Sequence, residues 1–178
     1  MSVQSVVWRA ALLVLVPLCG FAREEPLGAG MEGFVYPHPV HMLDLRMERE
    51  PVRMAYMDVA PEGQANGGTV VLLHGRNFFG AYWQDTIDVL RRAGYRVVVP
   101  DQIGFGKSSK PDVPHSLHLH AQNTRRLLAS LNIERATLIA HSLGGMMAVR
   151  FALMYPEMTQ RLVLEAPIGL EDYRTAVP

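Results

Sequence analysis

Four short apolar runs divide the second half of the chain, and each is long enough for one buried strand. They cover residues 69–73, 96–100, 136–140 and 161–165. Unbroken apolar runs between turn residues are typical of strands covered on both faces of a parallel sheet. Two earlier extended segments, 40–48 and 52–60, are separated at Pro51 and favour a β-hairpin or two edge strands.

Helical spacing of apolar residues fills the gaps between the four runs. It predicts helices over 81–93, 117–131 and 143–155, the first ended by Gly94 and the last by Pro156. Strands that alternate with helices indicate the α/β class, with a mostly parallel, doubly wound sheet and helices on both faces. The ligand site of such a sheet lies beyond the carboxyl ends of its strands, so the loops that follow the four runs are the places to search for chemistry.

The amino-acid composition excludes several classes of protein. Of the 178 residues, 49% are hydrophobic and 19% are charged, which is a globular composition. Lys and Arg together number 17, as do Asp and Glu, so the net charge is zero and no basic field exists to hold nucleic acid. A single cysteine excludes an internal disulfide. No apolar run reaches the roughly 18 residues of a membrane span, so none is expected once the N-terminal segment is removed.

The first residues are predicted to be a secretory signal peptide. Arg9 precedes an unbroken apolar run, and Gly20 and Ala22 place small residues at positions −3 and −1 of a cleavage site. An uncleaved anchor or a buried helix is the alternative. Cleavage after Ala22 would remove the one cysteine, which suits a secreted or periplasmic location. The predicted organisation is a signal peptide (1–22), an irregular lead-in (23–38) and one α/β domain (39–178).

The strongest chemical signal lies between the third run and the third helix. The segment reads Ala140-His141-Ser142-Leu143-Gly144-Gly145. Small residues two positions before and two after the serine are needed where a strand turns sharply into a helix, and that turn lifts the serine hydroxyl above the sheet. The N–H of Leu143, at the start of the helix, then points toward any negative charge that develops there.

A second signal, the segment His74-Gly75-Arg76-Asn77, follows the first run. A loop at this place can supply a second oxyanion donor from its backbone, and glycine permits a close approach. The N–H of Arg76 is the expected donor, with that of Asn77 as the alternative. His74 could act as a catalytic base, but a hydrogen-bonding role that supports the loop is the favoured interpretation.

Two further patterns invite a ligand-binding interpretation. The segment 106–108 (GKS) is similar to the end of a phosphate-binding loop, but Asp101 stands where that loop needs glycine, and prolines follow in place of a helix. A structural turn beside the site is expected instead. His115, His118 and His120 are close in sequence without a carboxylate or cysteine set, which favours a solvated helix start over a metal site.

Taken together, the motifs after the first three runs resemble those of the α/β-hydrolase fold family, over about residues 40–178. The resemblance implies that Ser142 is a nucleophile and that the N–H groups of Leu143 and Arg76 form an oxyanion hole. The implied reaction is hydrolysis of a small-molecule ester, amide or related acyl compound through an acyl-enzyme, with no metal or cofactor. Phe78, Phe79 and Trp83 are expected to line the substrate pocket.

The sequence departs from the family pattern in its histidine. In the family the chain order is nucleophile, acid, histidine, and here no histidine follows His141. The chain is therefore expected to be the N-terminal part of a hydrolase, with the sheet truncated after about the sixth strand. Glu165 is a candidate relay acid, since some branches place the acid directly after that strand, or else a carboxylate that caps or packs there. Alternative functions are related chemistry at Ser142, such as C–C bond hydrolysis or perhydrolysis, and a catalytically dead remnant or binding protein.

Overall fold

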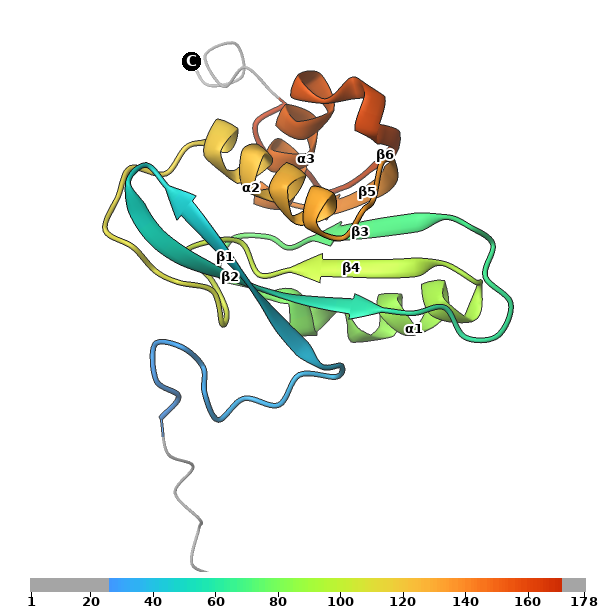
Figure 1. Cartoon of the computed structure of the whole chain (residues 1–178), viewed down its shortest axis with the longest axis horizontal. Helices are drawn as coiled ribbons and strands as arrows, with labels where there is room; N and C mark the ends of the chain where they lie inside the picture. The colour runs from blue at the N-terminus through green and yellow to red at the C-terminus, as the bar shows by residue number, and fades with distance from the viewer. Residues whose placement is uncertain (1–25, 171–178) are drawn as a thin grey trace, which may run out of the picture.

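Six strands form one sheet in the order β1-β2-β4-β3-β5-β6 (Figure 1). The computed structural model describes residues 26–170, so the predicted signal peptide and its cleavage site lie outside the described part of the chain. The strands are β1 (Val40–Met47), β2 (Glu50–Val59), β3 (Thr69–Leu73), β4 (Arg96–Pro100), β5 (Ala136–His141) and β6 (Thr159–Glu165). β1 and β2 form an antiparallel hairpin, and β2 is antiparallel to β4. The remaining pairs are parallel, so the predicted mostly parallel sheet is confirmed.

Three helices cover the sheet, α1 on one face and α2 and α3 on the other (Figure 1). Their bounds are α1 (Gln84–Arg92), α2 (Leu117–Ser130) and α3 (Leu143–Met154). The first predicted helix is divided, because a 3₁₀ turn, η1 (Gly80–Trp83), precedes α1. The Ser116 hydroxyl begins α2 by accepting a hydrogen bond from the Leu119 N–H at 3.2 Å. A short 3₁₀ turn, η2 (Pro156–Met158), follows α3.

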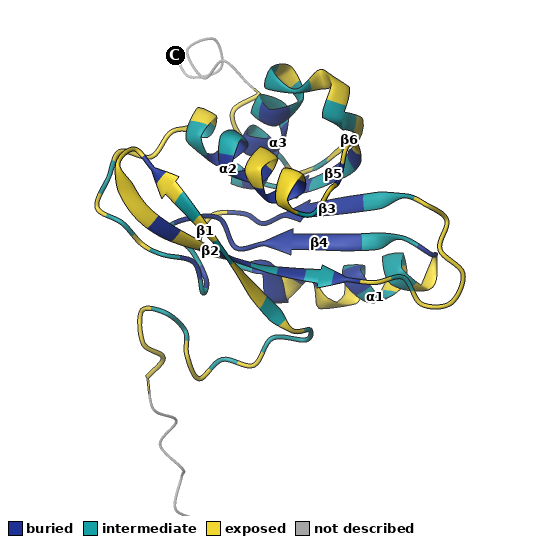
Figure 2. Ribbon diagram, in the orientation of Figure 1, coloured by how far each residue is buried: buried dark blue, intermediate teal, exposed yellow. Residues whose placement is uncertain are grey.

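Two cores, one on each face of the sheet, explain the unbroken apolar runs. Val71 and Leu73 of β3 pack under α2 and α3, whereas Val70 and Leu72 pack toward α1. Successive residues of a strand point to opposite faces, so a strand with helices on both sides needs an apolar residue at every position. Figure 2 shows β3 and β4 as the most completely buried strands.

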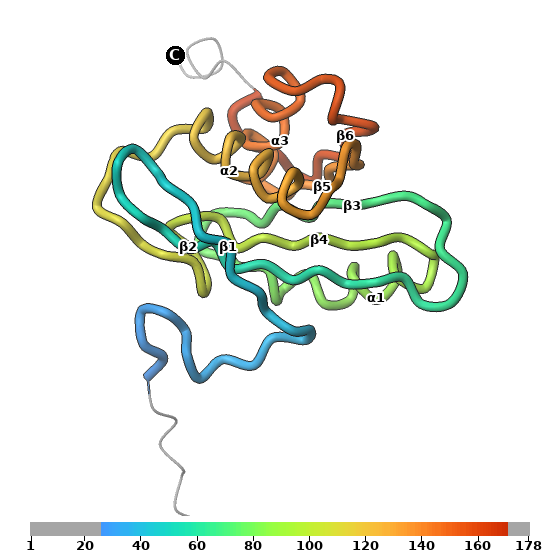
Figure 3. The backbone as a smooth tube through the Cα atoms, in the orientation of Figure 1, coloured from blue at the N-terminus to red at the C-terminus, as the bar shows by residue number. Residues whose placement is uncertain are grey.

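Figure 3 traces the path of the lead-in from residue 26 to β1, and Tyr36 packs against the core on the face that carries α1. Phe34 and Tyr36 pack against Phe79 with ring centroids 5.0 and 5.8 Å away. The irregular segment expected before the domain is therefore docked on it by aromatic contacts, at least from residue 34.

The far edge of the described sheet is β6. Within residues 26–170 it pairs with β5 alone, and Val163 is 47% exposed on the face away from α3. Leu162 and Leu164, on the other face, contact the core beneath α2 and α3. No helix in this described part of the chain has the length and apolarity needed to cross a membrane.

Candidate active site

Ser142 forms the turn between β5 and α3, with φ 52° and ψ −118°. A positive φ is rare for a residue with a Cβ atom, and such backbone strain concentrates at functional sites. Three backbone hydrogen bonds hold the turn in place, one of them from the Ile168 N–H to the Ser142 carbonyl at 3.3 Å. The Ser142 N–H donates to the Glu165 carbonyl at 3.0 Å, and the Ser142 carbonyl accepts from the Gly145 N–H at 2.9 Å. The side chain does not cap α3, so this hydroxyl is not committed to the helix.

The small residues around Ser142 are required by close backbone contacts. A Cβ atom added to Gly144 would collide with the main-chain carbonyl oxygens of Leu73 and His74. A Cβ atom added to Gly145 would lie only 2.7 Å from the Pro167 side chain. The pattern of small residues seen in the sequence therefore lets the first turn of α3 approach the end of β3.

The loop after β3 lies directly against the serine. A Cβ atom on Gly75 would come within 3.2 Å of the Ser142 Cβ and within 3.0 Å of His141 Nδ1. Gly75 accepts a hydrogen bond from the Phe78 N–H at 3.2 Å, and Asn77 has φ 64° at the third position of this turn. Within residues 26–170 the Arg76 N–H donates no hydrogen bond. It is therefore available for the role that the sequence predicted.

His74 links the loops after β3 and β4. Its ring is 1% exposed, Nε2 accepts a hydrogen bond from the Gln102 N–H at 2.9 Å, and Nδ1 lies 2.9 Å from the Gly75 carbonyl oxygen. Because Nε2 is an acceptor, the proton of the neutral ring is on Nδ1, which donates to Gly75. Burial lowers the pKa of His74. With both nitrogens engaged, the ring supports the loop, as the sequence favoured.

Asp101, the first residue after β4, organises the neighbouring loop. Its carboxylate is 1% exposed and accepts hydrogen bonds from the Tyr36 hydroxyl at 2.6 Å, the Gly80 N–H at 2.6 Å and the Lys107 N–H at 2.7 Å. Gly106 has φ 50°, and a Cβ atom there would collide with the same carboxylate. The structural turn predicted over this segment is therefore present and is built around Asp101. Sequence reasoning did not find the part that Tyr36 plays.

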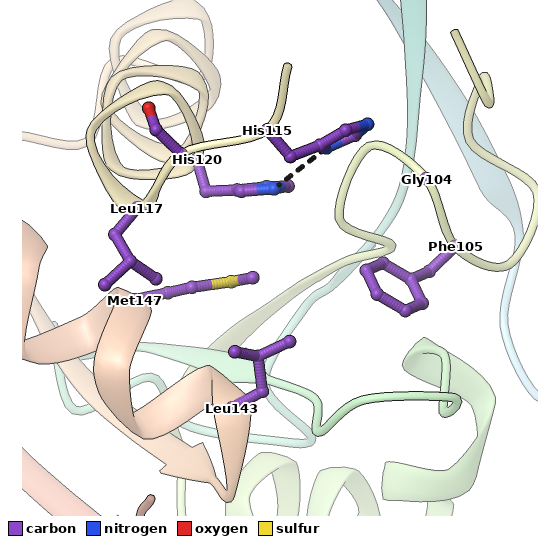
Figure 4. Close-up of a pocket in the computed structure, with 8 residues that line it drawn as sticks. Gly104, Phe105, His115, Leu117, His120, Leu143 and Met147 are labelled. Carbon is purple, nitrogen blue, oxygen red and sulfur yellow. Dashed lines mark hydrogen bonds between the residues drawn. The ribbon is translucent and has the colours of Figure 1, made fainter. Parts of the chain in front are cut away.

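A pocket of about 360 Å³ opens beside Leu143 (Figure 4). His120 lines this pocket and is 4% exposed, so the prediction of a solvated helix start is wrong for this residue, although His115 and His118 are exposed. His120 Nε2 lies 3.3 Å from His115 Nδ1, and His120 Nδ1 lies 3.3 Å from Gln102 Oε1. Helical spacing alone could not show that the Gln102 loop shelters the ring.

Phe78, Phe79 and Trp83, the aromatic residues predicted for the substrate pocket, do not line this pocket. Trp83 is 4% exposed in the core beneath α1, and Phe79 packs against the lead-in. Phe78 is 45% exposed and stacks on Tyr82 at 5.0 Å, with His141 6.0 Å away. Of the three, Phe78 alone is both exposed and near the serine turn.

Glu165 ends β6 directly opposite His141 in the strand register, and its side chain is exposed. Leu164 of the same strand faces the core under α2 and α3, so Glu165 points to the α1 side of the sheet edge. Burial, and then the charge of Glu165, raise the pKa of the Tyr82 hydroxyl. Among the described residues, no histidine is hydrogen-bonded to Ser142 or to Glu165. The serine turn, the loop after β3 and the candidate acid thus meet at one edge of the sheet, without a histidine hydrogen-bonded to the serine in the described part of the chain.

Acid is expected to destabilise the protein between pH 6.5 and about 4. Burial, aided by the neighbouring His115 and His74, lowers the pKa of His120 from 6.5 to about 4. Between these values the unfolded chain binds more protons than the folded chain, so the free energy of unfolding falls as the pH falls. His120 alone contributes up to about 3 kcal/mol. Urea unfolding measured from pH 8 to pH 4 tests this.

Two variants identify the source of the acid effect. His120→Gln removes the titrating ring and should flatten the pH profile, whereas His118→Gln, on the exposed face of the same helix, should leave it unchanged. Equal slopes for all three proteins would contradict the assignment.

Comparison with known proteins agrees with this geometry. A family model described as "alpha/beta hydrolase fold" matches residues 68–176. The crystal structure of a probable hydrolytic enzyme from Pseudomonas aeruginosa PAO1 superposes with a TM-score of 0.81 at 52% identity, over 85% of this chain and 49% of that one. A haloalkane dehalogenase from Mycolicibacterium paratuberculosis is 35% identical over 132 residues, which are 72% of this chain and 43% of its own.

A further relative is the 2-hydroxy-6-oxononadienedioate/2-hydroxy-6-oxononatrienedioate hydrolase from Comamonas testosteroni. It is 36% identical over 128 residues, which are 69% of this chain and 43% of its own. The chain thus spans less than half the length of each of these three relatives. The family match extends over more than half of the chain and includes the loop after β3, the Asp101 loop and the serine turn. The chain belongs to the alpha/beta hydrolase fold family.

Proposed function

We propose that this protein is a serine hydrolase in which Ser142 attacks the carbonyl carbon of a small ester, amide or related acyl compound. The observation that carries the proposal is the strained Ser142 backbone, φ 52°, at a strand-to-helix turn packed against Gly75. Strain of this kind holds a reactive group in position at many active sites. Similarity to a probable hydrolytic enzyme and to a curated hydrolase supports the same reaction class.

The first chemical step forms a bond between Ser142 Oγ and the carbonyl carbon, while the hydroxyl proton passes to a general base. The N–H groups of Leu143 and Arg76 donate hydrogen bonds to the developing oxyanion. The first turn of α3 contains no acidic residue, so no carboxylate there opposes the negative charge. Collapse of the adduct expels the alcohol or amine, which takes the proton, and water then releases the acyl group as an acid.

The described residues provide no general base hydrogen-bonded to Ser142. No histidine follows His141 in the sequence, and the chain spans less than half of each relative described above. We therefore place the base in sequence that the longer relatives contain beyond the shared stretch. Glu165, at the end of β6, is the candidate for the acid that orients it. A catalytically dead remnant or binding protein is the alternative, favoured by the absence of a base bonded to Ser142 among the described residues.

Export is part of the proposal. A weakly charged start, an apolar run and small residues before Arg23 form the layout of a cleavable signal. Intact-mass analysis of the protein purified from its own cells should show a chain that begins at Arg23. A chain that retains residues 1–22 would contradict export by this route.

A fluorophosphonate probe is expected to label the protein at Ser142. The serine oxygen displaces fluoride from phosphorus, and the product is identified by the mass of the peptide that carries the serine. Ser142→Ala should show no labelling at this peptide. Gly75→Ala, which pushes the loop after β3 against Ser142 and His141, should slow labelling roughly tenfold or more.

The labelling is measured over hours, because attack without a base is slow. A chain that unfolds cooperatively on heating but acquires no label at Ser142 would support the binding-protein alternative. Equal labelling of wild type and Ser142→Ala would contradict the assignment of the nucleophile.

A further inference from the structure

The pocket beside Leu143 has one polar side and an apolar remainder. Figure 4 shows His115 and His120 along one side, Leu143 on the opposite side, and Met147 and Phe105 on the two flanks. Leu143 follows the candidate nucleophile in sequence, so the pocket begins at the serine turn. Its volume of about 360 Å³ is near the lower end for ligand pockets, which suits a small group.

Among residues 26–170, no Asp, Glu, Lys or Arg lines this pocket. An ionised group brought into it would lose water without gaining a partner of opposite charge, which is costly. Burial also lowers the pKa of His120 to about 4, so that this ring is neutral at physiological pH. The wall therefore favours an uncharged ligand.

The two imidazoles form a fixed hydrogen-bonding surface. His120 is held between His115 Nδ1 and Gln102 Oε1, each contact at 3.3 Å, and the two rings stack at 5.4 Å between centroids. The backbone N–H of Gln102 in turn donates to His74 Nε2 beneath the loop after β3. His115 Nε2 makes no hydrogen bond recorded for the described residues, which leaves one ring nitrogen to meet a ligand.

We infer that this pocket binds the uncharged part of an acyl substrate, with an apolar body between Phe105, Leu143 and Met147 and one hydrogen-bonding group at His115. The inference rests on the proposed function, since it names the kind of compound that Ser142 would meet. A carboxylate at this position should bind more weakly, because the pocket offers it no partner of opposite charge. His115 selects the substrate without taking part in the bond-making step.

Two probes of the same shape test the inference. Phenylacetamide is neutral and phenylacetate is charged, and both titrations are repeated in Ser142→Ala, in which attack on the amide is impossible. At pH 8, above the ordinary imidazole pKa, titration of the full chain should show the amide binding at least about tenfold more tightly than the carboxylate. In protein labelled with ¹³C-methyl methionine, the Met147 signal, identified by its loss in Met147→Leu, should shift with the amide.

Variants of the exposed helix start provide matched controls. His115→Ala should weaken amide binding roughly threefold to tenfold, the worth of one neutral hydrogen bond. His115→Asn should retain part of that affinity, and His118→Ala should retain all of it. Equal binding of the two probes, or an unchanged affinity in His115→Ala, would overturn the inference.

The probes separate this inference from the proposed function, because Ser142→Ala should bind the amide as wild type does. Amide binding in a protein whose serine never reacts with fluorophosphonate would overturn the hydrolase proposal and support the pocket as a ligand site. Serine labelling without a preference for the amide would overturn the pocket inference alone.

Discussion

Replacing Asp101 with alanine is expected to lower the free energy of unfolding by about 3–5 kcal/mol. The carboxylate accepts three hydrogen bonds, from the Tyr36 hydroxyl and the backbone N–H groups of Gly80 and Lys107. Alanine leaves all three donors without this acceptor, and the Gly80 N–H is buried, so that water cannot replace the carboxylate there. The effect is measured by urea unfolding, followed through the fluorescence of the buried Trp83.

Asp44→Ala is the matched control for this experiment. Asp44 is 91% exposed in its side chain and contacts Arg53 across 3.6 Å, so its removal should change stability by less than about 0.5 kcal/mol. Asp101→Asn should give an intermediate loss, because one carbonyl oxygen remains to accept hydrogen bonds. A loss below about 1 kcal/mol in Asp101→Ala would show that the loop does not depend on this carboxylate.

Gly144→Ala is expected to cost about 2–4 kcal/mol of stability and to reduce labelling of Ser142. The added methyl group would meet the carbonyl oxygens of Leu73 and His74, which are backbone atoms and cannot rotate away. Either α3 moves outward or the end of β3 moves, and both displacements change the position of the serine turn. Urea unfolding and the rate of fluorophosphonate labelling measure the two effects.

Gly33→Ala serves as the control substitution. Its Cβ atom would meet only Leu27 Cδ2, at the ordinary contact distance of 3.6 Å, so stability should stay within about 0.5 kcal/mol of wild type. A Gly144→Ala protein that is as stable and as reactive as wild type would show that the close approach of α3 to β3 is not needed.

The apolar pattern predicted the sheet because its central strands have a core on both sides. Val70, Val71, Leu72 and Leu73 alternate between the two cores, which is why every position of that strand is apolar. The pattern was weaker at the edge, where β6 begins at Thr159, two residues before its predicted start, with half-exposed or exposed residues. The spacing predicts one continuous helix across the 3₁₀ turn at Gly80–Trp83, because both kinds of helix bring residues three apart onto one side.

The serine turn was predictable from the sequence because its constraint is local, whereas the rest of the site depends on distant residues. The Tyr36 hydroxyl donates a hydrogen bond to Asp101, 65 positions away in the sequence. The spacing of residues along the chain cannot predict such a distant pair. His120 is buried against Gln102, which lies 18 positions earlier, at the far end of the loop that precedes its helix. Trp83 was expected near the substrate, but aromatic residues carry much apolar area and are as useful in a core, where the structure places it.

A sequence selected for stability alone would carry glycine at position 142. The φ of 52° and ψ of −118° are close to the values that glycine supplies at the first central position of a type II′ turn. A side chain in this region costs of order 1–3 kcal/mol, from a total stability of only about 5–15 kcal/mol for a typical domain. Under the proposed function, stability and activity oppose each other at Ser142, and laboratory evolution toward heat resistance would tend to remove this hydroxyl first.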